Sequence, residues 1–368
     1  MIKKIIPVVL SLAMVCTTVS YADHTDRKEA KLLTYEKAVE LAVKNSLEIK
    51  RTEKQISKQE TSDEELDVQG RILVEMMNQN PEYGEMMDKV AFGLEKSTLE
   101  KDFYDKQVRY TKVMLEFAIR NLFNEIDTVY AEIKLHDKEI GMLKKEIAIA
   151  DVKKERGLIS KYDYNSLNNS LQEMQKNKTQ KYLTLNKHLL ELNKYLNLKD
   201  LNEYSIVEIP YSFKPLNLKD EEVKLKGMQA SSANMQVVAK EHGVSLQKLI
   251  LDRNLYEGSR AIRQADIYID ETEILKLKED VRSGVEREYQ NLKLLQERIE
   301  LLKQQREIKV EELENEKIKL VAGKVSSFSL EKKKMELEQM DVQIRELIKA
   351  YETAKIHFNQ IYLTGSSM

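Results

Sequence analysis

The sequence predicts an all-α protein made of duplicated, long antiparallel coiled-coil helical hairpins. Three observations support this prediction. The 368 residues include only 11 Gly, 4 Pro and no Trp, so the chain has few turn-forming residues. Apolar residues recur every three or four positions over long stretches, which is the spacing of helices that pack along a seam. The same Gly-containing turn motif occurs once in each half of the chain.

The charge composition excludes one large class of function. Lys and Arg together number 60 and Asp and Glu 62, which gives a net charge of −2. A nucleic-acid-binding protein needs a basic face to neutralise phosphates, so we expect no nucleic-acid partner. Charged residues make up 33 % of the chain, above the roughly 25 % of an average globular protein, which favours long solvated helices.

The N-terminus has the pattern of a secretory signal peptide, predicted for residues 1–22. Lys3 and Lys4 precede an apolar run, residues 5–15, that is too short to span a bilayer, and residues 20–22 (SYA) fit cleavage after Ala22. An uncleaved N-terminal anchor is the alternative. A lipid anchor on Cys16 is disfavoured because Val15 stands where a small residue is expected. Since Cys16 is the only cysteine, the exported chain would have no disulfide and would rely on helix packing.

A Pro-containing linker, residues 205–218, divides the chain into two repeats, residues 23–204 and 219–368. Residues 156–164 (RGLISKYDY) match residues 322–330 (AGKVSSFSL), and residues 35–44 resemble residues 219–228. Two shared landmarks in the same order favour an internal duplication.

Long heptad seams flank the two turn motifs. The first seam predicts a helix from about Val108 to Arg156, and His136 is its single polar member. We interpret His136 as a polar core residue that fixes the helix register, with a pH-sensitive gate as the alternative. The seam positions before the first turn are 122, 126, 129, 133, 136, 140, 143 and 147. Those after the second turn are 337, 340, 344, 347, 351, 354, 358 and 361.

The helix before the second turn has two apolar stripes. One runs through Leu292 and Ile299, and the other is offset and contains Leu294, Leu301 and Ile308. Neighbouring positions on a helix point about 100° apart. The two stripes therefore predict that this helix packs against partners on two sides.

Each turn motif has the residues that a tight helical hairpin requires. Gly157 and Gly323 can end the incoming helices, because glycine adopts the left-handed backbone readily. Ser160 and Ser326 can each cap the outgoing helix by accepting a backbone N–H.

Two repeats of this kind resemble the TolC-like outer membrane efflux protein family. Residues 33–48 (LTYEKAVELAVKNSLE) look like that family's opening helix, and residues 156–163 and 322–329 look like its two coiled-coil tips. The resemblance implies a trimer whose hairpins form a hollow helical cylinder. It also implies that the tips dock on a periplasmic adaptor or an inner-membrane transporter.

The same family inserts two strands into each half to build a transmembrane β-barrel. The corresponding stretches here, residues 66–99 and 265–270, lack the alternation of apolar and polar residues over about 10 positions that such strands show. We therefore expect these strands to be absent or degenerate.

The candidate site residues lie at the two tips. A docking role is the hypothesis, and a purely structural turn is the alternative. By the resemblance, the docking residues are Gly157, Leu158, Ile159, Ser160 and Asp163 in the first tip and Gly323, Lys324, Val325 and Ser326 in the second. Ser329 stands where the second tip would match Asp163.

The sequence offers no catalytic or cofactor motif. It contains no His-Glu-x-x-His, Cys-x-x-Cys, phosphate-loop or dinucleotide-binding pattern. We therefore expect no enzyme activity, no cofactor and no bound metal.

Two functional interpretations remain. The first is an exported component of an efflux or secretion assembly that forms a passive helical conduit in the cell envelope, at the outer membrane, in the periplasm or at the cell surface. The second is an exported coiled-coil scaffold or surface protein without a channel. A periplasmic adaptor is less favoured, because adaptors carry strand-rich domains around a single hairpin.

Overall fold

The computed structural model describes residues 31–77, 83–199, 201 and 204–365. The expected signal peptide and its cleavage site lie outside the described residues. The helices are α1 (Tyr35–Asn45), α2 (Leu47–Met77), α3 (Gly84–Glu155), α4 (Lys161–Leu196), α5 (Asp220–Ala233), α6 (Met235–Asp252), α7 (Arg260–Val321) and α8 (Ser327–Asn359). Within the described residues, two three-residue strands, β1 (Lys31–Leu33) and β2 (Tyr204–Ile206), complete the elements. The predicted all-α class is confirmed.

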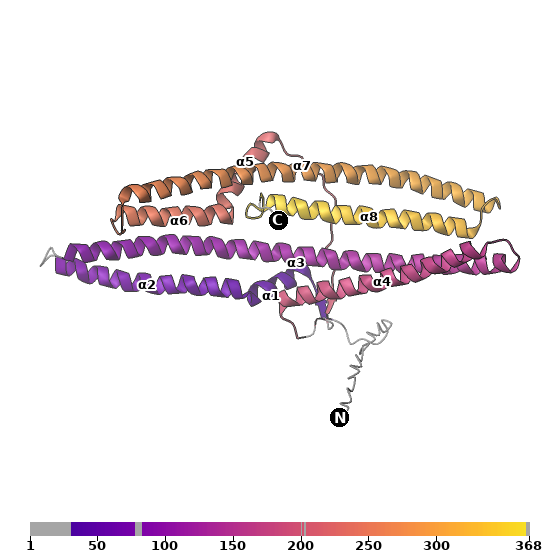
Figure 1. Cartoon of the computed structure of the whole chain (residues 1–368), viewed down its shortest axis with the longest axis horizontal. Coiled ribbons are helices and arrows are strands. Elements are labelled where there is room, and N and C mark those ends of the chain that lie inside the picture. Colours follow the sequence, from indigo (N-terminus) through magenta and orange to yellow (C-terminus); the bar gives the residue numbers. More distant parts are fainter. Residues whose placement is uncertain (1–30, 78–82, 200, 202–203, 366–368) are drawn as a thin grey trace, which may run out of the picture.

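Each half contains one long helix with two shorter helices placed end to end along it (Figure 1). Helix α3 packs against α2 and α4, and helix α7 packs against α6 and α8. The helices therefore form one elongated layer in the order α7, then α6 with α8, then α3, then α2 with α4 (Figure 1). Helices α7 and α2 with α4 form the two edges of this layer.

The predicted start of the long helix of the first half is wrong. We expected it near Val108, but α3 begins at Gly84 because its first turns pack against α2 and bury Val90. Gly93 allows α2 and α3 to approach each other closely, because a Cβ added there would lie only 2.8 Å from Leu66 Cδ1. Residues 265–270 lie within α7, and described residues 66–77 and 84–99 are helical, so the expected absence of strands holds there.

The predicted seams form the cores. All seven apolar positions of the first seam are buried, and they are Leu122, Ile126, Val129, Ile133, Ile140, Leu143 and Ile147. His136 is half-buried, and its Nδ1 lies 2.9 Å from Glu139 Oε2. In the second seam, Ile344, Tyr351 and Phe358 are buried, whereas Ile361 lies beyond the end of α8. Each half therefore has its own apolar core.

Polar groups are prominent where the two halves meet. Asn124 on α3 donates to Thr353 Oγ1 on α8 at 2.9 Å, and Arg253 pairs with Asp88 at 3.6 Å. Phe103 stacks on His242 with ring centroids 4.6 Å apart. The halves thus meet largely through charges and hydrogen bonds, in contrast to the apolar packing inside each half.

The segment between the halves lies across α8. Strand β1 pairs in parallel with β2, and the chain then crosses to α5 in an extended conformation (Figure 1). The Leu216 N–H donates to Tyr351 Oη at 2.7 Å, and Lys355 Nζ donates to the carbonyl of Lys214 at 2.9 Å. These bonds fix the crossing segment to one face of the helical layer.

Among the helices that the structure describes, none is both long enough and apolar enough to cross a membrane.

Candidate functional site

The turn between α3 and α4 is a Schellman motif followed by a serine cap. Gly157 has φ +70°, and its N–H donates to the carbonyl of Lys154 at 3.0 Å. The N–H of Leu158 donates to the carbonyl of Lys153 at 2.8 Å. Ser160 Oγ then accepts the N–H of Asp163 at 3.0 Å and donates to the Asp163 carboxylate at 2.7 Å. These bonds satisfy orphan backbone groups at both helix ends.

The turn between α7 and α8 has the same backbone construction. Gly323 has φ +67°, and its N–H donates to the carbonyl of Leu320 at 2.9 Å. The N–H of Lys324 donates to the carbonyl of Lys319 at 2.9 Å, and Ser326 Oγ accepts the N–H of Ser329 at 3.2 Å. The sequence motif therefore encodes one turn geometry twice.

The side chains of the two tips differ. Leu158 is 70 % exposed at the first tip, and its counterpart at the second tip is the exposed Lys324. Ile159 and Val325 occupy equivalent positions and are both half-buried. Each tip therefore keeps one branched apolar residue partly inside the turn, but only the first adds a freely exposed leucine.

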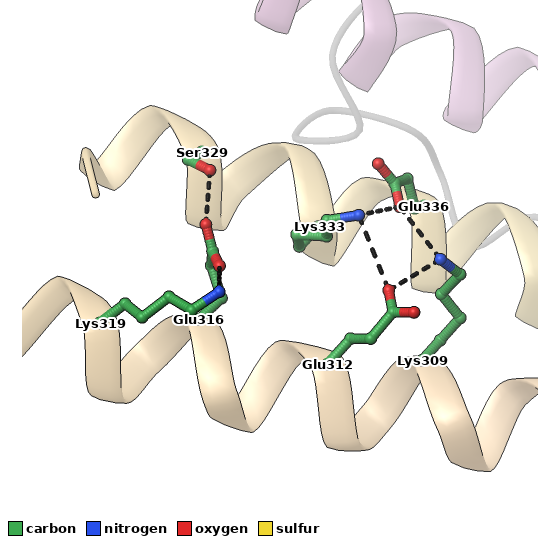
Figure 2. Close-up of polar contacts among 7 residues, drawn as sticks. All are labelled: Lys309, Glu312, Glu316, Lys319, Ser329, Lys333 and Glu336. Atoms are coloured by element: carbon green, nitrogen blue, oxygen red, sulfur yellow. Dashed lines mark hydrogen bonds and ion pairs between the residues drawn. The ribbon is translucent and has the colours of Figure 1, made fainter. Parts of the chain in front are cut away.

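Ser329 and Asp163 play different roles. The Asp163 carboxylate accepts a hydrogen bond from Ser160, the N-cap of its own helix, whereas Ser329 Oγ donates across the hairpin to Glu316 Oε1 at 2.7 Å (Figure 2). Glu316 is almost fully buried and also pairs with Lys319 at 3.3 Å. The hydrogen bond from Ser329, followed by Lys319, lowers the pKa of Glu316. The serine thus ties α8 to α7 close to the tip.

A four-residue ion network lies further from the second tip. Lys309 pairs with Glu312 at 2.8 Å and Lys333 pairs with Glu336 at 2.9 Å. Cross pairs of 3.7 Å, from Lys333 to Glu312, and 3.8 Å, from Lys309 to Glu336, join α7 to α8 (Figure 2). Together with the Glu316 contacts, this network fixes the last turns of the second hairpin.

Both tips lie at the same end of the molecule (Figure 1). Close to the tips, two ion pairs join α3 to α8. Lys145 lies 2.7 Å from Glu331, and Lys332 lies 3.0 Å from Glu146. The predicted tip residues, which are far apart in the sequence, are therefore presented as two neighbouring turns.

Some exposed apolar residues near the tips were not predicted as site residues. Val321 is 91 % exposed at the end of α7, and Tyr162 and Ile318 are also largely exposed. A signal was available in the sequence: these residues lie within five positions of the turn glycines and off the heptad seam. They enlarge the apolar surface that the two tips present.

The described residues contain no group of three or more His, Cys, Asp or Glu side chains that could hold a metal ion.

No protein-family model and no curated protein matches the sequence. Solved structures do match the fold. The structure of CusC matches with a TM-score of 0.60 and 9 % identity, over 89 % of this chain and 91 % of that one. The outer-membrane channel OprN matches with a TM-score of 0.61 and 10 % identity, over 87 % and 89 %. The Campylobacter jejuni CmeC outer membrane channel matches with a TM-score of 0.58 and 11 % identity, over 90 % and 86 %. The chain therefore has the helical-hairpin fold of the TolC-like outer membrane channels.

Proposed function

We propose that this protein is an exported component of an efflux or secretion assembly in the cell envelope. Several copies form a passive helical conduit, and the paired hairpin tips dock on a periplasmic adaptor or an inner-membrane transporter. The fold shared with outer membrane channels supports this proposal. The observation that carries it is the pair of equivalent turns presented at one end of an elongated helical layer.

Assembly of several copies is supported by apolar side chains on the two edges of the layer. Leu294 and Leu301 on α7 are 64 % and 54 % exposed, whereas Leu292 and Ile299 on the same helix are buried. On the opposite edge, α4 exposes Leu183 and Leu190, which are also seven residues apart. Heptad-spaced leucines on two edges can pack as a coiled-coil seam between copies.

The two edges are different surfaces, so one copy would present α7 to α4 of the next. Such a head-to-tail contact closes into a ring when the rotation between copies permits. A trimer is the oligomer that the resemblance implies.

Docking at the tips is supported by their exposed apolar residues. Leu158 lies in a tight turn and Val321 directly before one, and in both turns backbone N–H groups donate to carbonyls of the preceding helix. An exposed leucine on a preorganised turn loses little conformational freedom when a partner helix covers it. The energy that opens the conduit at its tip end would come from the partner protein.

Site-specific photo-crosslinking in the native cell tests the docking role. A photoreactive residue replaces Leu158 or Lys324 at the tips, and Lys176, exposed on α4, serves as the shaft control. We expect an adaptor or transporter to be captured from both tips and not from the shaft. Self-adducts alone, or equal capture at all three positions, would reject docking and favour the exported scaffold.

A further inference from the structure

Helix α7 presents a continuous row of exposed side chains along its edge of the helical layer. Its buried residues Ile267, Ile274 and Val281 face the core at intervals of seven residues. A second series runs from Ile262 to Ile308 in alternating steps of four and three residues, and every member is exposed. Each of the three buried residues comes five positions after a member of this series, which is a rotation of about 140°. This series, the α7 row, therefore faces away from the core.

The opposite edge of the layer has similar rows on α2 and α4. The α2 row runs from Leu47 to Ile72 and the α4 row from Asn169 to Leu190, with the same alternating spacing and with every member exposed. Both helices pack against α3, and they lie end to end along it (Figure 1). One edge of the chain thus offers two short rows, and the other edge offers one long row.

The leucines of the α4 row lie at the same level along the layer as those of the α7 row. Three contacts relate the levels of successive antiparallel helices, and they are Lys181–Glu132, Glu331–Lys145 and Ser329–Glu316, each at 2.7 Å. Counting residues from these contacts places Leu183 level with Leu301 and Leu190 level with Leu294, within about one helical turn. The two edges therefore match in height.

The α2 row is level with the first half of the α7 row. The contacts that relate these helices are Glu48–Thr111 at 3.5 Å, Phe103–His242 with ring centroids 4.6 Å apart, and Glu241–Lys278 at 2.6 Å. The same counting places Arg51 level with Asp280, within about one helical turn. These two residues have opposite charges, and neither side chain makes an ion pair or hydrogen bond within the described residues.

The two rows are also complementary in charge over this section. The α2 row contains three basic residues and one acidic residue, which are Arg51, Lys54, Lys58 and Glu65. The α7 row from Ile262 to Asp280 contains three acidic residues and one basic residue, which are Asp266, Glu273, Asp280 and Lys276. Opposite charges on facing surfaces steer association and disfavour wrong partners. A second copy of this chain therefore supplies acidic residues at the level where α2 is basic.

We propose that α2 of one copy packs along the N-terminal half of α7 of a second copy, with Arg51 pairing with Asp280. The partner of the basic α2 row is thus another copy of the same chain. This inference rests on the proposed function, because a ring of copies related by rotation about an axis parallel to the helices keeps each residue at its own level. It extends the seam between copies from the leucines of α4 to a charged section on α2.

Disulfide trapping of the full-length protein in its cell envelope tests this contact. Cys16→Ser first removes the only native cysteine. Arg51→Cys with Asp280→Cys, the α2 pair, places two cysteines at one level. The control is Arg51→Cys with Glu273→Cys, which is displaced by seven residues, or about 10 Å. A disulfide requires Cα atoms less than about 7 Å apart. We expect covalent multimers on non-reducing gels from the α2 pair and monomers from the control.

A third cysteine variant reports the assembly of copies separately. Leu190→Cys with Leu294→Cys, the α4 pair, spans the contact on which the proposed conduit depends, and it should also give covalent multimers. In all three variants the two cysteines lie on opposite edges of one chain, so each disulfide joins two copies.

Charge reversal tests the ion pair itself. Arg51→Glu or Asp280→Arg alone places like charges at one level and should raise the dissociation constant of the oligomer about fivefold, the upper range for an exposed pair. The two substitutions together should restore it. Lys334→Glu reverses an exposed charge on α8, away from both edges, and should leave it unchanged. Analytical ultracentrifugation measures the constant, and far-UV circular dichroism checks that each variant keeps its helices.

Trapping of the α4 pair without the α2 pair would overturn this inference and leave the proposed conduit intact. Monomers from both pairs would overturn the inference together with the proposed assembly. Equal trapping of the α2 pair and its displaced control, or a double reversal that assembles no better than the single ones, would also overturn it.

Discussion

Lys349 of α8 and Asp127 of α3 form a buried ion pair between the two halves of the protein. Lys349 is only 4 % exposed. Its ammonium group has lost most of its hydration, and the Asp127 carboxylate is its compensating partner. Buried pairs of this kind are costly to break but often replaceable by apolar residues of similar volume. The pair therefore contributes more to the specificity of the contact between the halves than to its strength.

Breaking this pair should destabilise the protein strongly. We expect Asp127→Ala to lower the free energy of unfolding by about 3 kcal/mol, because it leaves the Lys349 ammonium buried without a partner. The double variant Asp127→Leu with Lys349→Met should be close to the unchanged protein, since both charges are gone. Urea denaturation of the two proteins measures the difference. A double variant as unstable as Asp127→Ala would contradict this account.

The same lysine should give stability a distinctive pH dependence. Burial lowers the pKa of Lys349 from 10.5 to about 8. Between these two values the unfolded chain binds more protons at this residue than the folded chain does, so the free energy of unfolding rises with pH. Below pH 8 both states are protonated, and the full cost of burying the charge remains. Relative to Lys349→Met, the unchanged protein should gain about 3 kcal/mol between pH 8 and 10.5. Parallel stability curves for the two proteins would argue against this shift.

One substitution should have opposite effects at two glycines. Gly157 has φ +70°, so Gly157→Ala places a Cβ in the left-handed region and should cost about 1 kcal/mol. Gly141 lies inside α3 with no neighbouring atom within 4 Å of an added Cβ. Gly141→Ala should therefore stabilise the protein by about 0.5–1 kcal/mol, the usual gain in a helix interior. Urea denaturation under identical conditions compares them, and unchanged or increased stability of Gly157→Ala would refute the assigned turn geometry.

Ser329 should not tolerate the residue found at the matching position of the first tip. Ser329→Asp would place a carboxylate where the hydroxyl now donates to Glu316 Oε1 at 2.7 Å. Repulsion between the two charges should cost about 1 kcal/mol or more and loosen the second tip. Hydrogen–deuterium exchange over residues 313–333 measures this local change. The matched control, Asp163→Ser, removes only a bond within one helix turn, so exchange at the second tip should be unchanged.

Apolar residues on the edge of α7 should control assembly. We expect Leu294→Asp with Leu301→Asp to convert the proposed oligomer to a monomer, because each carboxylate would be buried at the proposed seam between copies. The fold should survive, since both leucines are exposed in the single chain. Light scattering after size-exclusion chromatography gives the mass. Leu255→Asp, in the turn between α6 and α7, is the exposed control and should assemble normally, whereas an unchanged mass for the edge variant would exclude this interface.

Local patterns predicted the parts of the fold that depend on neighbouring residues. The heptad spacing located the buried side chains from Leu122 to Ile147, and the Gly and Ser positions located both turns. The heptad spacing did not predict that α3 begins at Gly84. The part of α3 that packs against α2 contains small and polar residues such as Gly93 and Ser97, which carry no periodic apolar signal. The different role of Ser329 was equally hidden, since it depends on Glu316 across the hairpin.

The sequence by itself determined the helical class, the two turns and the positions that face each core. These features follow from short-range rules: helix periodicity, the left-handed backbone of glycine and serine capping. Only the tertiary structure decided how the halves meet, where Lys349 finds its partner and how Glu288 and His357 come to line one cavity. Those arrangements join residues far apart in the chain through charges and hydrogen bonds. A polar side chain has no preferred partner until the helices are placed, so the sequence pattern alone cannot choose one.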